Sequence, residues 1–199
     1  MVARKGIYFY TDGVQVIFQF DGDPESYIAG GCHVNVMPPL ICPHCGRADC
    51  LEPLGYYQRG ITSAKEVDIL SLDIRRFLCW VTGKTVSMLP DFAQPYRLVR
   101  NSTVQKFFSG VRVEIDVVRW TPLLQRYWRR FATWFPVLLE NAAEHSGPSP
   151  PKAEHFWSFF VSEWGELAGA TLRLVGVFRI TAFGRYRCHQ VSTNVSEKD

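Results

Sequence analysis

The sequence predicts an α+β protein with an N-terminal β-hairpin region, a small β domain and a helical C-terminal half. Segments with strand-like alternation dominate as far as Pro90, whereas helical periodicity and proline-led helix starts follow Pro95. Of the 199 residues, 47% are hydrophobic and 14% aromatic, which is enough apolar surface for a core and excludes a disordered chain. The net charge of +3 by itself indicates no partner.

The first predicted segment spans residues 1–41. Residues 7–20 are β-branched and aromatic on both sides of Asp12-Gly13, a dipeptide that favours a tight hairpin turn. Residues 21–41 are rich in Gly, Pro and Asp, so we expect a long connection there.

The second predicted segment, residues 42–96, has the texture of short strands separated by glycine-containing turns. Residues 69–78 alternate between apolar and polar side chains, as a half-buried strand does.

The third predicted segment, residues 97–145, is helical and basic. Ser102 is positioned to cap a short helix over 103–109 that Gly110 ends, and Thr121-Pro122 is a strong helix start. We expect Pro136 to kink or end that second helix near Trp134. Residues 111–117 fit either a short strand or a turn of helix, and the two helices around them are a candidate helix-turn-helix.

The fourth predicted segment, residues 152–191, follows a Ser/Gly/Pro linker and contains an aromatic helix over about 153–167. Its large apolar residues surround more than one face, so we expect burial on several sides. One wall would come from Trp128, Phe131 and Trp134, and another from Phe18 and Phe20.

The motif most suggestive of chemistry is Cys42-Pro43-His44-Cys45-Gly46. Such a turn lets two thiolates face one cation, as in a zinc knuckle, and Cys79 stands where a second knuckle should begin. Thr82 occupies the matching position three residues later, so the fourth donor would be Cys50, His44 or water. The predicted zinc ligands are Cys42, Cys45, Cys50 and Cys79. A metal-free remnant with packed cysteines is the alternative, and the strand-rich context disfavours a redox pair.

A family resemblance rests on four runs of sequence. They are Cys42-Pro-His-Cys-Gly, Gly55-Tyr-Tyr-Gln-Arg59, Ile74-Arg-Arg-Phe-Leu-Cys79 and Gly83-Lys-Thr-Val-Ser-Met-Leu-Pro-Asp-Phe92, followed by Pro95-Tyr96. Together they resemble the zinc-ribbon region of bacterial insertion-sequence transposases and related mobile-element proteins of the DUF6431 type. The resemblance covers about residues 42–96 and extends loosely to Phe135. It implies a zinc-ribbon-like domain that leads into a helix-turn-helix, with Thr82 in place of the family's fourth cysteine.

Basic residues concentrate in the third segment. Residues 97–130 hold eight Arg or Lys and two acidic residues, a net charge of +6, and such a field attracts phosphates. The predicted nucleic-acid contacts are Arg97, Arg100, Lys106, Arg119, Arg126, Arg129 and Arg130. An ordinary solvated helix face is the alternative.

These features together indicate a class of function. The sequence contains no catalytic constellation, and the chain has no room for the RNase H-like domain of a complete transposase. We therefore expect a cytoplasmic, non-enzymatic DNA-binding accessory protein, without a membrane span and with a recombinase or transposase as a further partner. The alternative is a protein-interaction adaptor that docks a recombinase, nuclease or other effector through its aromatic C-terminal helices.

Overall fold

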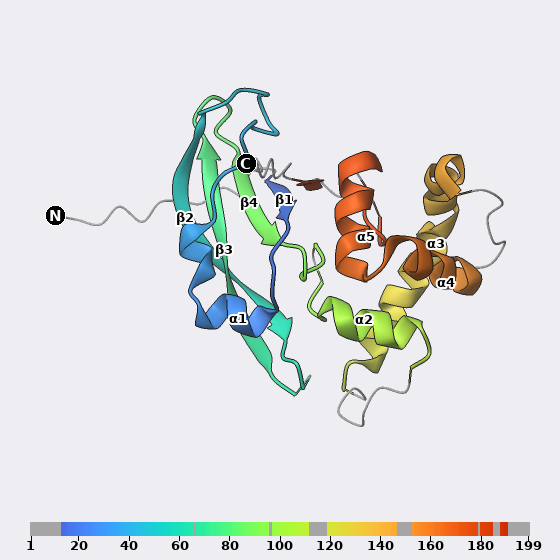
Figure 1. The fold of residues 1–199 in the computed structure, drawn as a ribbon. Coiled ribbons are helices and arrows are strands. Elements are labelled where there is room, and N and C mark those ends of the chain that lie inside the picture. The colour runs from blue at the N-terminus through green and yellow to red at the C-terminus, as the bar shows by residue number, and fades with distance from the viewer. Residues whose placement is uncertain are drawn as a thin grey trace, which may run out of the picture.

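The predicted α+β class is confirmed. The computed structural model describes residues 13–65, 67–95, 97–111, 119–146, 153–178, 180–184 and 188–190. A sheet occupies one side of the molecule and helices α2 to α5 gather on the other (Figure 1). No helix in these ranges combines the length and the apolar character needed to cross a bilayer.

The sheet has the strand order β2-β3-β4-β1-β5. Its strands are β1 (Val14–Phe18), β2 (Leu51–Thr62), β3 (Ile69–Cys79), β4 (Thr85–Pro90) and β5 (Cys188–Gln190). The strands β2, β3 and β4 pair antiparallel, whereas β1 pairs in parallel with β4 on one side and β5 on the other. The alternation over 69–78 is thus confirmed as β3.

The pairing of β1 differs from the hairpin that the sequence predicts. Val16 lies opposite Met88 of β4 and His189 of β5, so both edges of β1 are taken by parallel neighbours. The first arm of the predicted hairpin and its Asp12 lie outside the described residues. Pairing of this kind depends on segments far away in the sequence, which a local turn signal cannot report.

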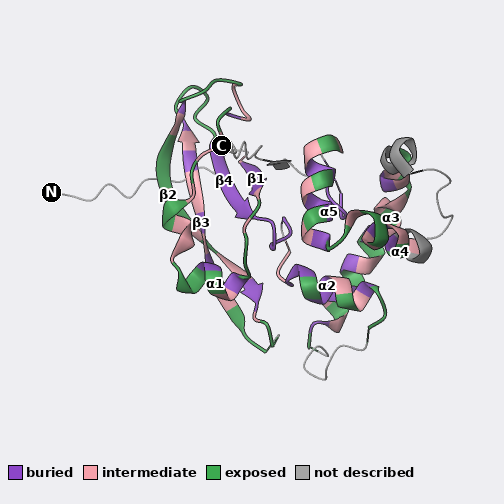
Figure 2. Ribbon diagram, viewed as in Figure 1, coloured by how far each residue is buried: buried purple, intermediate pink, exposed green. Residues whose placement is uncertain are grey.

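Both faces of the sheet are covered near β1 and β4, which are buried along almost their whole length, while most of β2 is exposed or half-buried (Figure 2). Ile17 and Leu89 pack on one face, and Val16 and Phe77 belong to a separate cluster.

The expected loop over 21–41 contains two helical elements, α1 (Pro24–Ala29) and the 3₁₀ turn η1 (Cys32–Asn35). Asp23 caps α1 by accepting the Ser26 N–H at 2.8 Å, and the Ser26 hydroxyl accepts the Asp23 N–H at 3.0 Å. With Pro24 at the first helical position, this start signal was present in the sequence. Tyr27 of α1 is fully buried against the sheet.

The helical half begins with α2 (Asn101–Phe108), close to its predicted range, and Gly110 follows with a φ of +67°. The helix α3 (Thr121–Ser146) starts at the predicted Thr121-Pro122. Of the two outcomes expected for Pro136, a kink or an end near Trp134, the end is wrong, because α3 continues to Ser146. Pro136 removes one backbone hydrogen bond, but it is exposed and Leu138 beyond it is buried in the same core as Phe131, so packing holds the helix together.

The predicted aromatic helix over about 153–167 is α4 (Ala153–Trp164). It ends at Gly165, whose φ is +75°, and a further helix, α5 (Leu167–Arg173), follows it. A single π-helical turn, η3 (Leu174–Phe178), continues α5. Trp157 and Phe160 are buried, as expected. Phe131 of α3 contacts Trp157 with ring centroids 5.4 Å apart, which confirms the first wall, whereas Phe18 and Phe20 pack in the sheet clusters instead.

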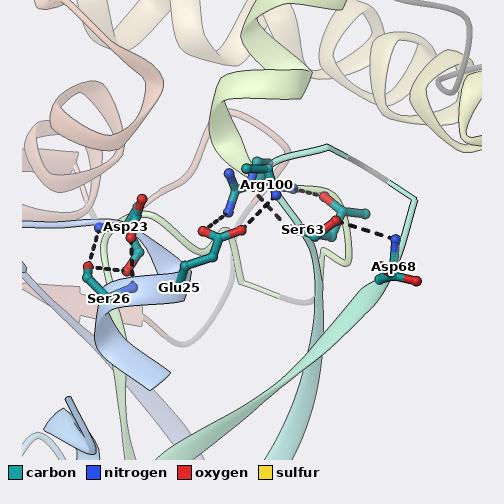
Figure 3. A network of polar contacts seen from close by, with 8 residues as sticks. Asp23, Glu25, Ser26, Ser63, Asp68 and Arg100 are labelled. Carbon is teal, nitrogen blue, oxygen red and sulfur yellow. Dashed lines mark hydrogen bonds and ion pairs between the residues drawn. The ribbon is translucent and has the colours of Figure 1, made fainter. Parts of the chain in front are cut away.

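A partly buried ion pair joins the two sides of the molecule. Glu25 of α1 contacts Arg100, which precedes α2, at 2.5 Å, and it also accepts the Ala64 N–H at 2.7 Å (Figure 3). Arg100 further donates from Nε to the Thr62 carbonyl at 3.2 Å. Residues 112–118, between the two helices of the predicted helix-turn-helix, lie outside the described residues.

Candidate metal centre

The first turn of the centre is closed by the backbone. The Gly46 N–H donates to the Cys42 carbonyl at 2.9 Å, and the Cys42 N–H donates to the Arg47 carbonyl at 2.9 Å. Gly46 has a φ of +71°, a conformation that glycine adopts without strain. This turn brings Cys42 and Cys45 to one side, as the sequence predicts.

A second turn repeats this arrangement at the end of β3. The Gly83 N–H donates to the Cys79 carbonyl at 2.8 Å, and the Cys79 N–H donates to the Lys84 carbonyl at 2.9 Å. Gly83 has a φ of +66°. Thr82 stands where the first turn has Cys45.

The fourth cysteine comes from the start of β2. Leu51 is the register partner of Cys79, and the Trp80 N–H donates to the Cys50 carbonyl at 3.1 Å. Asp49, with a φ of +58°, turns the chain immediately before Cys50. The pairing of β2 with β3 therefore places Cys50 beside Cys79.

The four sulfur atoms of Cys42, Cys45, Cys50 and Cys79 all lie within 4.8 Å of one another, close enough to hold one metal ion. The Sγ of Cys50 is 3.3 Å from that of Cys45 and 3.8 Å from that of Cys79, and the Sγ atoms of Cys45 and Cys79 are 3.7 Å apart. Tetrahedral ligands at the usual zinc–sulfur distance would be about 3.8 Å apart. The thiols thus approach the spacing of a four-sulfur site.

The surroundings of the thiols affect their ionisation differently. Burial raises the pKa of Cys42 and of Cys50. Burial also acts to raise the pKa of Cys79, but hydrogen bonds from Thr82 and the neighbouring thiols outweigh it and lower that pKa to about 6. A bound cation would stabilise all four thiolates, since coordination favours the deprotonated form.

His44, the other protein donor considered from the sequence, is engaged elsewhere. Its Nε2 donates to the Thr85 carbonyl at 3.1 Å. Cys50 is therefore the fourth residue of the cluster.

The predicted nucleic-acid contacts fall into two groups. Arg100 is buried against Glu25, and the Arg97 guanidinium lies over the rings of Tyr127 and Phe183 at 5.1 and 5.2 Å. These two arginines contact the protein's own interior.

The remaining five are exposed. Arg119 donates to the Val67 carbonyl at 3.2 Å and Arg130 donates from Nε to the Phe183 carbonyl at 2.7 Å. Within the described residues, Arg126 and Arg129 of α3 have no ion pair. The structure therefore presents Lys106, Arg119, Arg126, Arg129 and Arg130 at the surface.

Two residues beside the centre were not singled out from the sequence as contacts. Thr82 hydrogen-bonds Cys79, and the signal that could have found it is Gly83, which stands at the same offset from Cys79 as Gly46 from Cys42. Trp80 is 54% exposed, and the Arg47 guanidinium lies 5.5 Å from its ring centroid. Nothing local in the sequence separates this tryptophan from the buried ones.

Comparison with known proteins gives no relative for this chain: no family model, no curated protein and no solved structure matches it.

Proposed function

We propose that the chain binds one zinc ion through Cys42, Cys45, Cys50 and Cys79 and acts as a non-enzymatic DNA-binding accessory protein. The clustering of four thiols around one point carries the zinc assignment. Tetrahedral sets of four thiolates are typical of zinc or iron, and a site filled by four protein ligands has no position open for a substrate. Its role is therefore structural.

The DNA-binding part rests on α3. Its exposed face carries Arg126, Arg129 and Arg130, while Phe131 on the other side lies in the aromatic core. A rigid helix that presents several guanidinium groups suits contacts with phosphates. The resemblance of residues 42–96 to transposase zinc ribbons supports the same proposal, with a mobile-element recombinase or transposase as a further partner.

An adaptor is the second candidate, and a different surface favours it. The aromatic residues Trp157 and Phe160 are buried within the chain, so they do not offer a docking surface. The end of the sheet beside the cysteines does, because Leu40, Ile41 and Trp80 are 69, 58 and 54% exposed.

A salt titration distinguishes the two candidates. We expect the protein to bind a mixed-sequence DNA duplex with an affinity that falls steeply with salt, because phosphate contacts release counterions. The variant Arg126→Gln/Arg129→Gln should bind more weakly and reduce the slope of log affinity against log salt by up to about two units. Lys65→Gln/Lys84→Gln is the matched control, since it removes two exposed charges from the sheet side.

Two results would contradict the proposed DNA binding or its location on α3. A slope that both double variants leave unchanged would remove α3 from the interface. Wild-type protein without salt-dependent binding to either the duplex or its single strands would overturn the DNA proposal and leave the adaptor.

A further inference from the structure

We propose that Trp80 stacks on an unpaired base, so that the end of the sheet beside the cysteines binds single-stranded DNA. This inference rests on the proposed DNA binding and names the form of DNA that a second surface of the chain takes. It concerns the sheet, whereas the phosphate contacts proposed above concern α3.

Trp80 differs from the other tryptophans of the chain in its exposure. It is 54% exposed, whereas each of the other five is buried or half-buried. Tryptophan is enriched at binding surfaces because its rigid ring offers a large contact area at a low cost in conformational entropy. An exposed tryptophan in a chain that buries the rest is therefore a candidate contact residue.

The backbone fixes the position of Trp80. Its N–H donates to the Cys50 carbonyl at 3.1 Å, which ties it to the start of β2. The turn that begins at Cys79 is closed by the Gly83 N–H, which donates to the Cys79 carbonyl at 2.8 Å. The ring is therefore presented from an ordered turn, so that little ordering is needed when a ligand binds.

A cation lies beside the ring. The guanidinium of Arg47, which is itself exposed, is 5.5 Å from the centroid of the Trp80 ring. Nucleotide bases stack on aromatic rings whatever their sequence, because every base has a π-face, and a neighbouring arginine adds a cation–π contribution. An exposed indole with an arginine over it thus suits an unpaired base.

Tyr56, the other exposed aromatic residue in the described part of the chain, is enclosed by its neighbours. The Arg75 guanidinium lies 4.7 Å from its ring centroid and donates to its hydroxyl, and the His33 ring packs edge-on against it at 4.9 Å. Among the described residues, no other aromatic ring packs against Trp80 in this way. Tyr56 is therefore a matched exposed aromatic that should not stack on a base.

The charges near Trp80 predict the character of the contact. Exposed Arg47 and Lys84 are offset by exposed Asp49 and Glu52, so little net charge attracts phosphates to this turn. The contact should come mainly from stacking, and its loss should leave the salt dependence of binding unchanged. Since the same ring belongs to the surface that would serve an adaptor, the test must separate bases from other partners.

The experiment compares single strands with and without bases. Wild-type protein should bind oligothymidylate more tightly than an abasic oligomer of the same length, with quenching of its tryptophan fluorescence. Trp80→Leu keeps an apolar side chain but removes the ring, and it should weaken oligothymidylate binding about 5- to 150-fold. The slope of log affinity against log salt should stay unchanged in this variant. Trp80→Phe should keep most of the affinity but lose most of the quenching, and Tyr56→Leu should bind as the wild type does.

Three results would overturn the inference. They are equal wild-type affinity for oligothymidylate and the abasic oligomer, unchanged affinity in Trp80→Leu, and binding of the duplex without binding of the single strand. Salt-dependent duplex binding in the same experiments would leave the proposed role of α3 standing. Wild-type protein that binds neither form of DNA would instead overturn the proposed DNA binding itself.

Discussion

The cysteine end of the sheet and the helical half are held together in opposite ways. Around the thiols, the buried cluster consists of Cys42, Cys50 and Cys79, and among the described hydrophobic residues Cys45 and Leu51 pack against it. In the helical half, the ring of Phe108 contacts those of both Trp128 and Trp157, each at a centroid distance of 4.9 Å. The helical half therefore has a large aromatic core, whereas the buried cluster at the cysteine end consists of thiols.

This difference indicates where a bound metal would matter. Cys50 and Cys79 are already neighbours through β2 and β3, so a metal adds mainly the attachment of the turn that contains Cys42 and Cys45. A metal would thus organise one end of the sheet and leave the helices unaffected.

The largest expected effect is the loss of this attachment. Cys79→Ser should abolish stoichiometric zinc, and hydrogen exchange at the Cys42 and Gly46 amides should become fast, because structural zinc sites of the zinc-finger kind contribute on the order of 10–16 kcal/mol of binding free energy. Protection around Phe131 should stay unchanged. Cys32→Ser is the matched control, since Cys32 lies outside the cluster. Loss of protection throughout α3 would contradict the division into two regions.

The next effect belongs to the helical half. Trp157 is 1% exposed and donates from Nε1 to the Ser109 hydroxyl at 3.0 Å. Trp157→Ala should lower the free energy of unfolding by about 3–5 kcal/mol, measured by urea denaturation, without changing zinc content. Trp80→Ala, which truncates an exposed tryptophan, should cost less than about 1 kcal/mol. Equal costs for the two variants would show that the cysteine end packs as tightly as the helices.

A smaller effect is expected where the two regions meet. Glu25→Ala leaves Arg100 largely buried without its carboxylate, but Glu25 itself is partly exposed, so the free energy of unfolding should fall by about 1–2 kcal/mol. Glu163→Ala, at an exposed site on α4, should have almost no effect. A similar loss in both variants would mean that the ion pair does not couple the sheet to the helices.

The smallest effect concerns the exposed face of α3. Arg126→Gln/Arg129→Gln should change the free energy of unfolding by no more than about 0.5 kcal/mol, because exposed charges without a close partner contribute little. Thermal melts of the variant and the wild type should therefore nearly coincide. A loss of several kcal/mol would place these side chains in the packing of the helical half.

The sequence predicted local features more reliably than distant ones. The turn from Cys42 to Gly46, the strand that ends at Cys79 and the helix start at Thr121 each depend on a few adjacent residues. Cys50 could be named only as one of several donors, because its place beside Cys79 depends on the register of β2 against β3.

The wrong or incomplete expectations share a physical origin in tertiary packing. Pro136 is tolerated because the helix around it is packed on both sides of the proline. The partners of β1 are strands far along the chain, and burial of Arg100 depends on Glu25 of α1. Charge counting along the sequence could not separate Arg100 from Arg126, although only the former pairs inside the protein.

The parallel pairing of β1 with β5 also determines when β1 can complete its pairing during synthesis of the chain. Gln15 pairs with Cys188, about 170 residues further along the chain. At a synthesis rate of about 5–20 residues per second, β1 would wait on the order of 10–30 s after leaving the ribosome before that neighbour exists. During this time one edge of an apolar parallel strand has no partner, so the nascent chain is most open to wrong strand pairing or to chaperone binding at its first strand.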